Sequence, residues 1–157
     1  ANDASVVLAE AVAGSEWQFV QLMNRRAKQL GAKNTRFANS HGLPTKKGTQ
    51  YTTAYDMYLI FHQALQHAFF KQSIRLRHKT IYSKEGRALN LKSHNKILFK
   101  SWDRAIYGKT GYTRRAGACF VGTLQEGKRT LIIGVFNCPN RWDDIKYIVS
   151  TFGNIPL

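Results

Sequence analysis

Three strand-like segments near the end of the chain are joined by very short connections, and this feature restricts the fold most. The segments span residues 105–113, 117–124 and 130–137, and Glu126-Gly127 forms the turn between the last two. Parallel neighbours need a crossover of about a dozen residues or more, so connections this short require antiparallel pairing. The sequence therefore predicts an antiparallel meander at the centre of the fold.

Helical patterns precede these strands. The segment 3–13 is rich in Ala and Val without a helix breaker, and it predicts a buried helix that ends at Gly14. Ser15 opens a second helix, because Gln18 stands at capping-box spacing and an apolar stripe of helical period follows. Gly31 ends this second helix at the position that favours glycine.

Two more helices and a hairpin complete the pattern. Thr53 and Asp56 indicate a helix start, and the apolar pattern continues to about His67. Residues 74–91 predict a hairpin of two modest strands, and residues 142–152 predict an amphipathic helix. This order indicates the α/β (α+β) class, with an antiparallel sheet flanked by helices. No apolar run approaches the ~18 residues of a membrane-spanning helix.

The chain is strongly basic, with 24 Lys and Arg against 9 Asp and Glu, a net charge of +15. Residues 71–115 hold 13 of the basic residues against two acidic ones, together with the aromatic residues Phe99, Trp102 and Tyr107. Such a field attracts nucleic acid, anionic lipid or cell-wall polymer, although a solvated face explains most of these side chains individually. Nucleic-acid binding is not expected, because the sequence holds no motif typical of it.

The two cysteines are too few for a disulfide scaffold, and their spacing does not indicate a metal site. Cys119 and Cys138 lie in apolar strand-like runs, and we expect buried free thiols. With a turn at Glu126-Gly127, Cys119 faces roughly residue 134, which argues against a bond between the two sulfurs. The histidines and cysteines lack zinc-ligand spacing, so no metal is expected.

Lys109-Thr110-Gly111 lies inside the first strand of the meander. A glycine in a strand interior often marks the close approach of another backbone. An ammonium and a hydroxyl just before it can hold a carboxylate while a peptide lies along the strand edge. Taken alone, the tripeptide is explained more often by an ordinary strand with a bulge, so its meaning depends on the motifs elsewhere in the chain.

Those other motifs occur in a fixed order. Asn2-Asp3-Ala4, followed by an Ala-rich helix, resembles the tail of a Ser-x-Asn-Asp-Ala motif, and Lys-Thr-Gly is the third motif of penicillin-binding proteins. Further matching segments are residues 19–24, 27–31, 34–43, 52–56, 94–95, 108–113 and 116–119. Together they resemble the D-alanyl-D-alanine carboxypeptidases, the low-molecular-mass penicillin-binding proteins, over essentially the whole chain.

The resemblance implies a penicillin-binding-protein/β-lactamase-like fold and a serine that forms an acyl-enzyme with the terminal D-Ala-D-Ala of a peptidoglycan stem peptide or with a β-lactam antibiotic. It implies that Asn2 hydrogen-bonds the substrate amide and that Lys109 and Thr110 bind the terminal carboxylate. It further implies that the strand at Gly111 and Tyr112 pairs with the substrate backbone, with one oxyanion-hole amide from Tyr112. No metal or organic cofactor is implied.

Other polar residues have a second explanation. Arg141 follows the last strand and is a candidate for an additional substrate-binding cation, although a surface arginine that caps the final helix explains it equally well. Asn39 and His41 are expected to fix the loop 32–52 through hydrogen bonds to its backbone. Asp56 is better explained as a helix-start charge than as an acid catalyst.

One motif of the family has no suitable match. Residues 93–96 fit Ser-x-x-Lys but lie between Asn2 and Lys109, whereas the family places that motif well before Ser-x-Asn at a helix start. We therefore expect the nucleophilic serine and its lysine base to lie upstream of Ala1. Residues 1–157 would then form a single partial domain, the C-terminal portion of a catalytic domain that lacks the family's N-terminal part and is inactive alone.

The resemblance also implies a place in the bacterial cell envelope, periplasmic or otherwise extracytoplasmic. The partners are then the stem peptide, β-lactams, the N-terminal part of the same protein, and an anionic wall polymer or the membrane surface for the basic face. An oxidising envelope leaves a Cys119–Cys138 bond open. A catalytically inactive protein that binds muropeptides or β-lactams is the alternative function.

Overall fold

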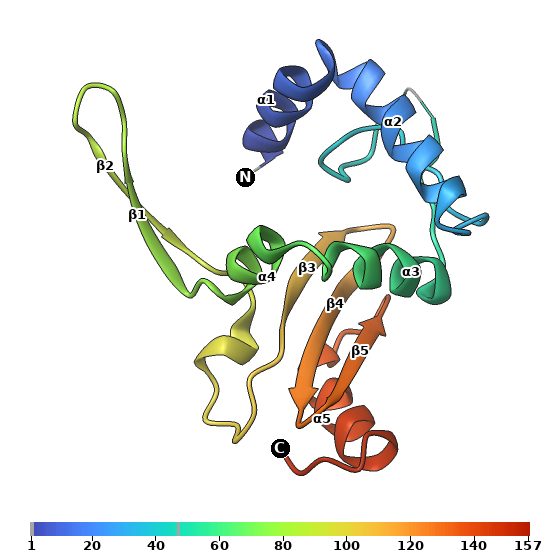
Figure 1. Cartoon of the computed structure of the whole chain (residues 1–157), viewed down its shortest axis with the longest axis vertical. Helices are drawn as coiled ribbons and strands as arrows, with labels where there is room; N and C mark the ends of the chain where they lie inside the picture. Colours follow the sequence, from blue (N-terminus) through green and yellow to red (C-terminus); the bar gives the residue numbers. More distant parts are fainter. Residues whose placement is uncertain (1, 47) are drawn as a thin grey trace.

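The computed structural model describes residues 2–46 and 48–157. Figure 1 shows a three-stranded sheet with α5 on one side and α3 and α4 on the other, while α1 and α2 lie beyond α3. The elements in chain order are α1 (Asn2–Ala13), α2 (Glu16–Gln29), α3 (Ala54–Ala64), α4 (Ala68–Arg75), β1 (His78–Tyr82), β2 (Ala88–Lys92), the 3₁₀ helix η1 (Lys96–Phe99), β3 (Tyr107–Thr113), β4 (Gly117–Glu126), β5 (Arg129–Val135) and α5 (Arg141–Phe152).

The central sheet is the antiparallel meander that the short connections require. Its strand order is β3-β4-β5, and both neighbours of β4 are antiparallel to it. Helices cover both faces of the sheet, which confirms the predicted fold class. None of the helices within the described residues is long and apolar enough to cross a membrane.

Side chains of β4 alternate between two cores. Phe120 and Leu124 pack in a cluster with Ile145 and Val149 of α5. On the opposite face, Val121 packs with Phe61 and Leu65 in a second cluster, called the α3 cluster below. Successive side chains of a strand point to opposite faces of the sheet. Because β4 has apolar side chains on both faces, both faces must be covered by other elements. The strand therefore serves as the common wall of both layers.

The register of the last hairpin differs from the expected one by two residues. Glu126 pairs with Arg129, so the two-residue turn is Gly127-Lys128, with Gly127 at a φ of 57°. Glycine adopts this positive φ without the steric cost that other residues meet. An even shift keeps each side chain on its face, which explains why the apolar pattern alone did not detect the error.

The first helix is largely exposed, which corrects the prediction of a buried one. Ala9 is fully buried, but Val7, Leu8 and Val12 are 63%, 65% and 67% exposed. The helix α1 packs mainly against α2, so its other face remains open. The apolar composition correctly indicated a helix that needs a partner, yet α2 covers only one side of it.

The helix starts follow their capping residues. The hydroxyl of Ser15 accepts the amide of Gln18 at 3.2 Å, and Thr53 caps α3 in the same way by accepting the amide of Asp56 at 3.1 Å. These bonds satisfy backbone donors that have no partner within the helix. Gly31 follows α2 with a φ of 84°. The predicted starts and this predicted stop are confirmed.

A helix replaces the beginning of the predicted hairpin. The helix α3 ends at Ala64, before the expected His67, and α4 follows over residues that include Ile74. Phe70 and Ile74 stand four apart, so they share one helix face, and both pack on the α3 cluster. Partial burial of this stripe favours a helix, so the prediction that the hairpin begins at residue 74 is wrong.

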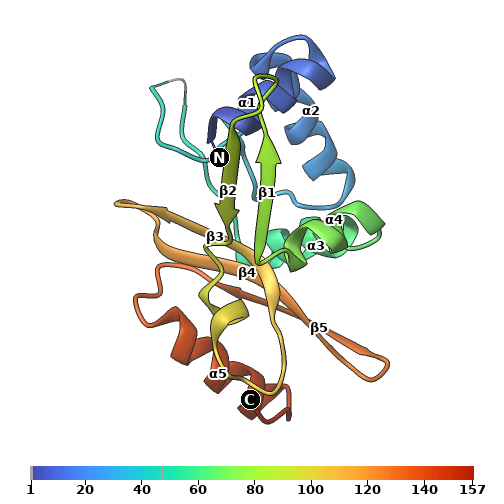
Figure 2. The same cartoon turned by 90° about the vertical axis from the view of Figure 1, so that its left-hand side faces the viewer.

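The hairpin itself is confirmed, with strands β1 and β2 in antiparallel register from His78↔Lys92 to Tyr82↔Ala88. All residues of both strands are exposed. Figure 1 shows the hairpin leaving the body of the molecule beside α4, and Figure 2 shows its turn reaching the level of α1. Its base, and not its tip, therefore adjoins the central sheet.

Polar side chains of α2 and α3 hold the long loop after α2. Asp56 is 2% exposed and accepts the amide of Asn34 and the hydroxyl of Thr35, both at 2.7 Å. The amide group of Asn24 donates to the carbonyl of Phe37 at 2.9 Å and accepts the Phe37 amide at 2.8 Å. The loop is thus attached to α2 and α3, with Asp56 at a helix start as expected.

Asn39 organises the part of this loop that includes residues 41–43. Its side-chain oxygen accepts the amides of His41 and Gly42, and its nitrogen donates to the carbonyl of Leu43 at 2.7 Å. The Nδ1 atom of His41 accepts the Leu43 amide at 3.2 Å, and its Nε2 atom lies 3.8 Å from a carboxylate oxygen of Glu16. Both side chains fix the loop, as predicted.

Gly108 tests how tightly β3 is held against β4. A Cβ atom at this position would lie 2.2 Å from the carbonyl oxygen of Val121, so Gly108→Ala should lower the free energy of unfolding by about 1–3 kcal/mol. A Cβ atom at Gly111, on the same strand, would meet Cys119 Cβ at 3.7 Å, so Gly111→Ala should change it by less than about 0.5 kcal/mol. Urea unfolding of both variants measures the difference, and equal losses would contradict this packing.

Candidate functional site

A cleft of about 1120 Å³ lies along β3 and contains all six residues singled out by the sequence. Three parts of the chain form it: the beginning of α1 with the loop at residues 41–43, the segment from the end of β2 to residue 100, and β3 with the beginning of α5. The six residues are Asn2, Lys109, Thr110, Gly111, Tyr112 and Arg141. The fold therefore joins residues that are far apart in the sequence.

The strand β3 offers a free edge to this cleft. It is the outer strand of the order β3-β4-β5 and pairs with β4 alone among the described strands. An edge strand carries a row of backbone N–H and C=O groups that an extended peptide can join. The cleft can thus take a peptide as an additional strand.

Close approach of another backbone within this chain occurs at Gly108, not at Gly111. The nearest atoms to a Cβ at Gly108 belong to the backbone of β4, whereas Gly111 has only Cys119 Cβ at 3.7 Å. Packing among the described residues therefore explains why residue 108 is a glycine, but it does not explain the glycine at residue 111. Gly111 is exposed and lines the cleft.

Lys109 brings a positive charge to this edge. Its ammonium donates a hydrogen bond to the carbonyl of Thr110. Although part of the side chain is exposed, the surrounding protein removes water from the ammonium and lowers its pKa below the ordinary lysine value. A partly desolvated cation gains more from a bound carboxylate than a fully hydrated one does.

Arg141 connects β3, β4 and α5. Its Nη1 atom donates to the carbonyls of Gly111 and Cys119 at 3.4 and 3.3 Å. Its guanidinium lies over the ring of Trp142, 4.6 Å from the ring centre. The side chain thus reaches back to the strands instead of capping the final helix, which places a second cation in the cleft.

Asn2 reaches the cleft from another element. It is the first residue of α1, where the hydroxyl of Ser5 donates to its carbonyl at 2.7 Å. Lys109 and Thr110 line the same cleft. The side-chain amide of Asn2 can hydrogen-bond an amide of a bound peptide. The cations of Lys109 and Arg141, with the hydroxyl of Thr110, can bind its terminal carboxylate.

Sequence reasoning did not assign the segment between β2 and β3 to the site. This segment lines the cleft with four basic side chains and one aromatic side chain, namely Lys92, His94, Lys96, Lys100 and Phe99. Two signals were present, namely the concentration of basic residues over 71–115 and the matching pair at residues 94–95. This segment also contains the 3₁₀ helix η1, which gives this side of the cleft a defined shape.

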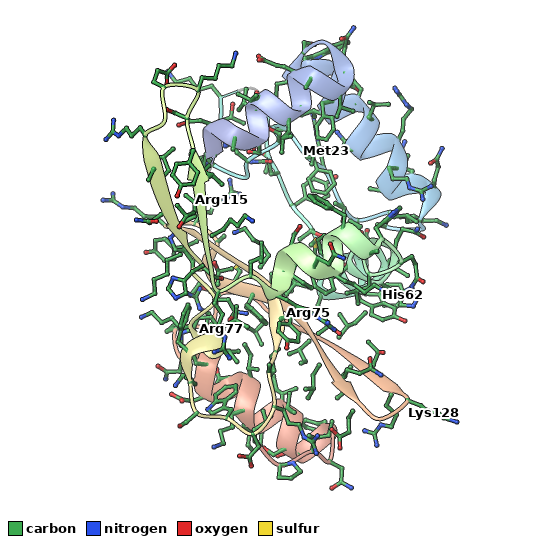
Figure 3. The ribbon with its side chains drawn as sticks, turned by 60° about the vertical axis from the view of Figure 1, so that its left-hand side comes forward. Met23, His62, Arg75, Arg77, Arg115 and Lys128 are labelled. Atoms are coloured by element: carbon green, nitrogen blue, oxygen red, sulfur yellow. The ribbon has the colours of Figure 1, made fainter. Side chains whose placement is uncertain are left out.

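The aromatic residues of the basic segment have cations stacked over them. The guanidinium of Arg75 lies 5.1 Å from the ring centre of Tyr107; the label of Arg75 in Figure 3 locates it at the end of α4. The ammonium of Lys92 lies 4.9 Å from the ring of Phe99. Such contacts stabilise a protein by about 0.5–1 kcal/mol at exposed sites, so these rings are part of the internal structure of the basic surface.

Both cysteines are free but only partly buried, which corrects the expectation of buried thiols. Cys119 lines the cleft. The observed register places Phe120 opposite Val135, so Cys119 is adjacent to Phe136 and not to residue 134. No group of three or more potential metal-ligating side chains occurs within residues 2–46 and 48–157.

Comparison with known proteins identifies the class to which this fold and cleft belong. A family model described as D-alanyl-D-alanine carboxypeptidase matches residues 1–140. The chain therefore belongs to the D-alanyl-D-alanine carboxypeptidase family, which confirms the resemblance of the ordered motifs.

Two curated relatives show how much of such a protein the chain represents. It is 35% identical over 135 residues to the D-alanyl-D-alanine carboxypeptidase DacF of Bacillus subtilis (strain 168), covering 86% of this chain and 34% of the relative. It is 37% identical over 137 residues to DacA of Escherichia coli (strain K12), covering 85% and 32%. The chain thus spans about a third of the length of these relatives.

Solved structures agree on the fold. Penicillin-binding protein D2 from Listeria monocytogenes, in its cefotaxime-bound form, has a TM-score of 0.80 and 28% identity, covering 96% of this chain and 60% of that one. A D-alanyl-D-alanine carboxypeptidase from Mycobacterium tuberculosis H37Rv has a TM-score of 0.76 and 30% identity, covering 85% and 50%. The chain has the fold of the penicillin-binding proteins, as predicted.

The pKa of the Cys138 thiol tests the contact between this residue and Asp144 of α5. Burial, a hydrogen bond from its thiol to Asp144 Oδ2 at 2.7 Å, and the charge of that carboxylate raise the pKa of Cys138 to about 11. The pH midpoint of alkylation at Cys138, measured by peptide mass spectrometry, should therefore lie near 11. Asp144→Asn should lower this midpoint because it removes the negative charge, whereas Asp143→Asn should leave it in place. An unshifted midpoint in Asp144→Asn would rule out the contact.

Proposed function

We propose that this chain supplies the peptide-binding wall of a serine-type D-Ala-D-Ala carboxypeptidase that acts on peptidoglycan stem peptides through an acyl-enzyme. One observation carries the proposal: a single cleft contains Asn2 of α1, Lys109 and Thr110 on an edge strand, and Arg141 at the start of α5. The family membership of the chain supports the same reaction class.

The terminal carboxylate of the substrate is assigned to the cationic end of the cleft. Lys109 offers an ammonium whose pKa is lowered by desolvation, and Thr110 offers a hydroxyl donor next to it. Arg141 adds a guanidinium that the strand carbonyls and the ring of Trp142 hold in place. Charge-assisted hydrogen bonds of this kind are about twice as strong as neutral ones.

The substrate backbone is assigned to the free edge of β3. A peptide that joins this edge passes Gly111, where only Cys119 lies within 4 Å of a Cβ position. The absence of a side chain there leaves room for a second backbone. The amide of Tyr112 is our candidate for one of the two donors that stabilise the oxyanion of the acylation step.

Asn2, which lines the same cleft from α1, is assigned to the amide of the scissile bond. The nucleophilic serine and its lysine base are assigned to residues outside 1–157. The Ser-x-x-Lys match at residues 93–96 is not assigned this role, because the hydroxyl of Ser93 accepts the amide of Asn95 at 3.2 Å. That bond is typical of a serine that forms a turn.

Attack of the serine oxygen on the penultimate carbonyl forms the acyl-enzyme and releases the terminal D-alanine. Water then hydrolyses the ester and restores the serine. A β-lactam would enter the same cleft through its own carboxylate and acylate the same serine. We assign this activity to the cell envelope, outside the cytoplasm, where the net charge of +15 suits anionic wall polymer or lipid headgroups.

Intact-mass spectrometry with a penicillin tests the proposed function. The 157-residue chain alone should gain no drug mass, whereas the product of the complete gene should gain one drug molecule. Lys109→Gln should slow this acylation about 100-fold, because it removes a charge that binds the carboxylate. Lys128→Gln, in the β4–β5 turn, removes the same charge away from the cleft and serves as the matched control.

The same measurement separates the alternative function. If the product of the complete gene binds the penicillin without gaining its mass, it is a muropeptide- or β-lactam-binding protein and not an enzyme. An acylation rate that is equal in Lys109→Gln and Lys128→Gln would contradict the assigned role of Lys109.

Gly111→Ala separates substrate fit from stability. The added methyl group meets only Cys119 Cβ at 3.7 Å in the protein itself, so the urea midpoint should stay within error of the parent value. It should nevertheless slow penicillin acylation about tenfold or more, because the methyl group would occupy space needed by the substrate backbone. A normal acylation rate would show that no peptide lies against this position.

A further inference from the structure

The loop after α2 lines two different hollows. Residues 41–43 line the cleft, whereas residues 33–38 line a second hollow of about 440 Å³, called the α2 groove below. The other wall of the α2 groove is the face of α2 from Trp17 to Lys28, and Tyr51 joins the side of the loop. None of the described residues lines both hollows. The α2 groove is therefore a separate site, and its volume is typical of ligand pockets.

Side-chain hydrogen bonds hold the two walls of the α2 groove together. The carboxylate of Glu16 accepts the amide and the hydroxyl of Ser40 at 3.0 and 2.7 Å. The side chain of Asn24, two turns further along α2, makes its two bonds to Phe37 at 2.9 and 2.8 Å. Figure 1 shows the loop beside α2, and these bonds fasten it there at two levels. The groove is thus formed before a ligand arrives, which lowers the entropic cost of binding.

The α2 groove is elongated. Trp17 and Lys28 are eleven residues apart on α2, and a helix rises ~1.5 Å per residue, so this wall extends over about 16 Å. After Lys28 the chain turns tightly: the amide of Gly31 donates to the carbonyl of Lys28 at 3.0 Å, and the amide of Lys33 donates to the carbonyl of Gly31 at 2.9 Å. Lys28 and Lys33 consequently lie at the end of the groove away from Trp17.

Two exposed aromatic side chains line the α2 groove from opposite walls. Trp17 is 68% exposed and Tyr51 is 54% exposed, although tryptophan is highly buried on average. The backbones of Arg36 and Tyr51 exchange two hydrogen bonds, at 2.9 and 3.2 Å. Residues that oppose each other in an antiparallel pair have their side chains on the same side, so the Tyr51 ring and the Arg36 guanidinium are neighbours. Open aromatic faces of this kind are suited to contact with a ligand.

Positive charge in the α2 groove is not neutralised by the protein. Lys28, Lys33 and Arg36 line it, and none of the three forms an ion pair within residues 2–46 and 48–157. Glu16 is the one acidic residue among the described lining, and its carboxylate already accepts the two bonds from Ser40. The groove therefore attracts anions.

From this arrangement we infer that the α2 groove binds a saccharide chain that carries carboxylate or phosphate groups. The apolar C–H faces of sugar rings pack on the aromatic faces of Trp17 and Tyr51. The anionic groups form charge-assisted hydrogen bonds with Lys28, Lys33 and Arg36. An elongated groove suits several linked rings better than a single one.

The inference goes beyond the proposed function, because it needs neither the cleft nor the acyl-enzyme. Single-stranded nucleic acid also combines rings with negative charge. The choice of a sugar polymer rests on the proposed function, which assigns the protein to the cell envelope and its net charge of +15 to anionic wall polymer. The α2 groove gives that attraction a defined site.

Dye-labelled probes test the ligand class by fluorescence anisotropy with the protein expressed from its complete gene. The probes are hyaluronan hexasaccharide, its neutral methyl ester, phosphorylated maltohexaose and tetrathymidylate. At low ionic strength the tighter of the two anionic sugars should bind about tenfold more strongly than the neutral ester, and it identifies the anion. This preference should fade in 0.5 M salt, where the screening length falls to ~4 Å. Equal affinity for the neutral ester, or tighter binding of tetrathymidylate, would overturn the inference.

Two pairs of variants locate the binding. Trp17→Ala should weaken sugar binding about tenfold or more, whereas Phe69→Ala, which removes an 81% exposed ring on α4, should not. Lys28→Gln/Arg36→Gln should reduce the preference for the anionic sugar to less than about threefold. Arg25→Gln/Arg26→Gln removes the same charge from α2 outside the groove lining and should keep the preference. All these side chains are exposed, so the urea midpoints should equal that of the parent. Equal losses in a variant and its control would assign the binding to the overall surface and overturn the α2 groove.

Penicillin acylation of the same samples separates this inference from the proposed function. Trp17→Ala should be acylated at the parent rate, because Trp17 does not line the cleft. Acylation without sugar binding would overturn the inference alone, also where residues outside 1–157 cover the groove. Sugar binding without acylation would overturn the enzymatic function and leave the α2 groove as a binding site.

Discussion

Burial of β4 on both faces is the constraint on which the rest of the structure depends. Phe120 and Leu124 require α5 on one side, and Val121 requires α3 on the other. With β5 on one edge of β4, the other edge is left for β3. The strand that carries Lys109 is consequently an outer strand, and it lines the cleft.

Amide and carboxylate side chains then hold the loop and the 3₁₀ helix that border the cleft. Asn24 and Asp56 attach the long loop to α2 and α3, and Asn39 holds residues 41–43 within that loop. Asn95 attaches η1 to the segment before β3. Each satisfies backbone groups that helices and strands leave unpaired, and an unpaired buried group would cost about 1–3 kcal/mol. The cationic side chains thus project from backbone that is held elsewhere, which keeps them in place despite their mutual repulsion.

Much of the fold was predictable because its signals are local. Ser15 and Thr53 cap helices through bonds that span three residues, and short connections force the meander into antiparallel pairing. The errors arose where a distant partner decided. Ile74 became part of a helix because the α3 cluster buries it, and Val7 on α1 stayed exposed because α2 covers only one face.

Motif chemistry along the chain was sufficient to indicate the family and the candidate residues Asn2, Lys109, Thr110, Gly111, Tyr112 and Arg141. The chain order could not show that they share a cleft, because Asn2 and Arg141 lie at opposite ends of the chain and meet only through the packing of helices and strands. It also could not distinguish Gly108, which the backbone of β4 requires, from Gly111, where a Cβ atom would make only an ordinary contact with Cys119 Cβ at 3.7 Å.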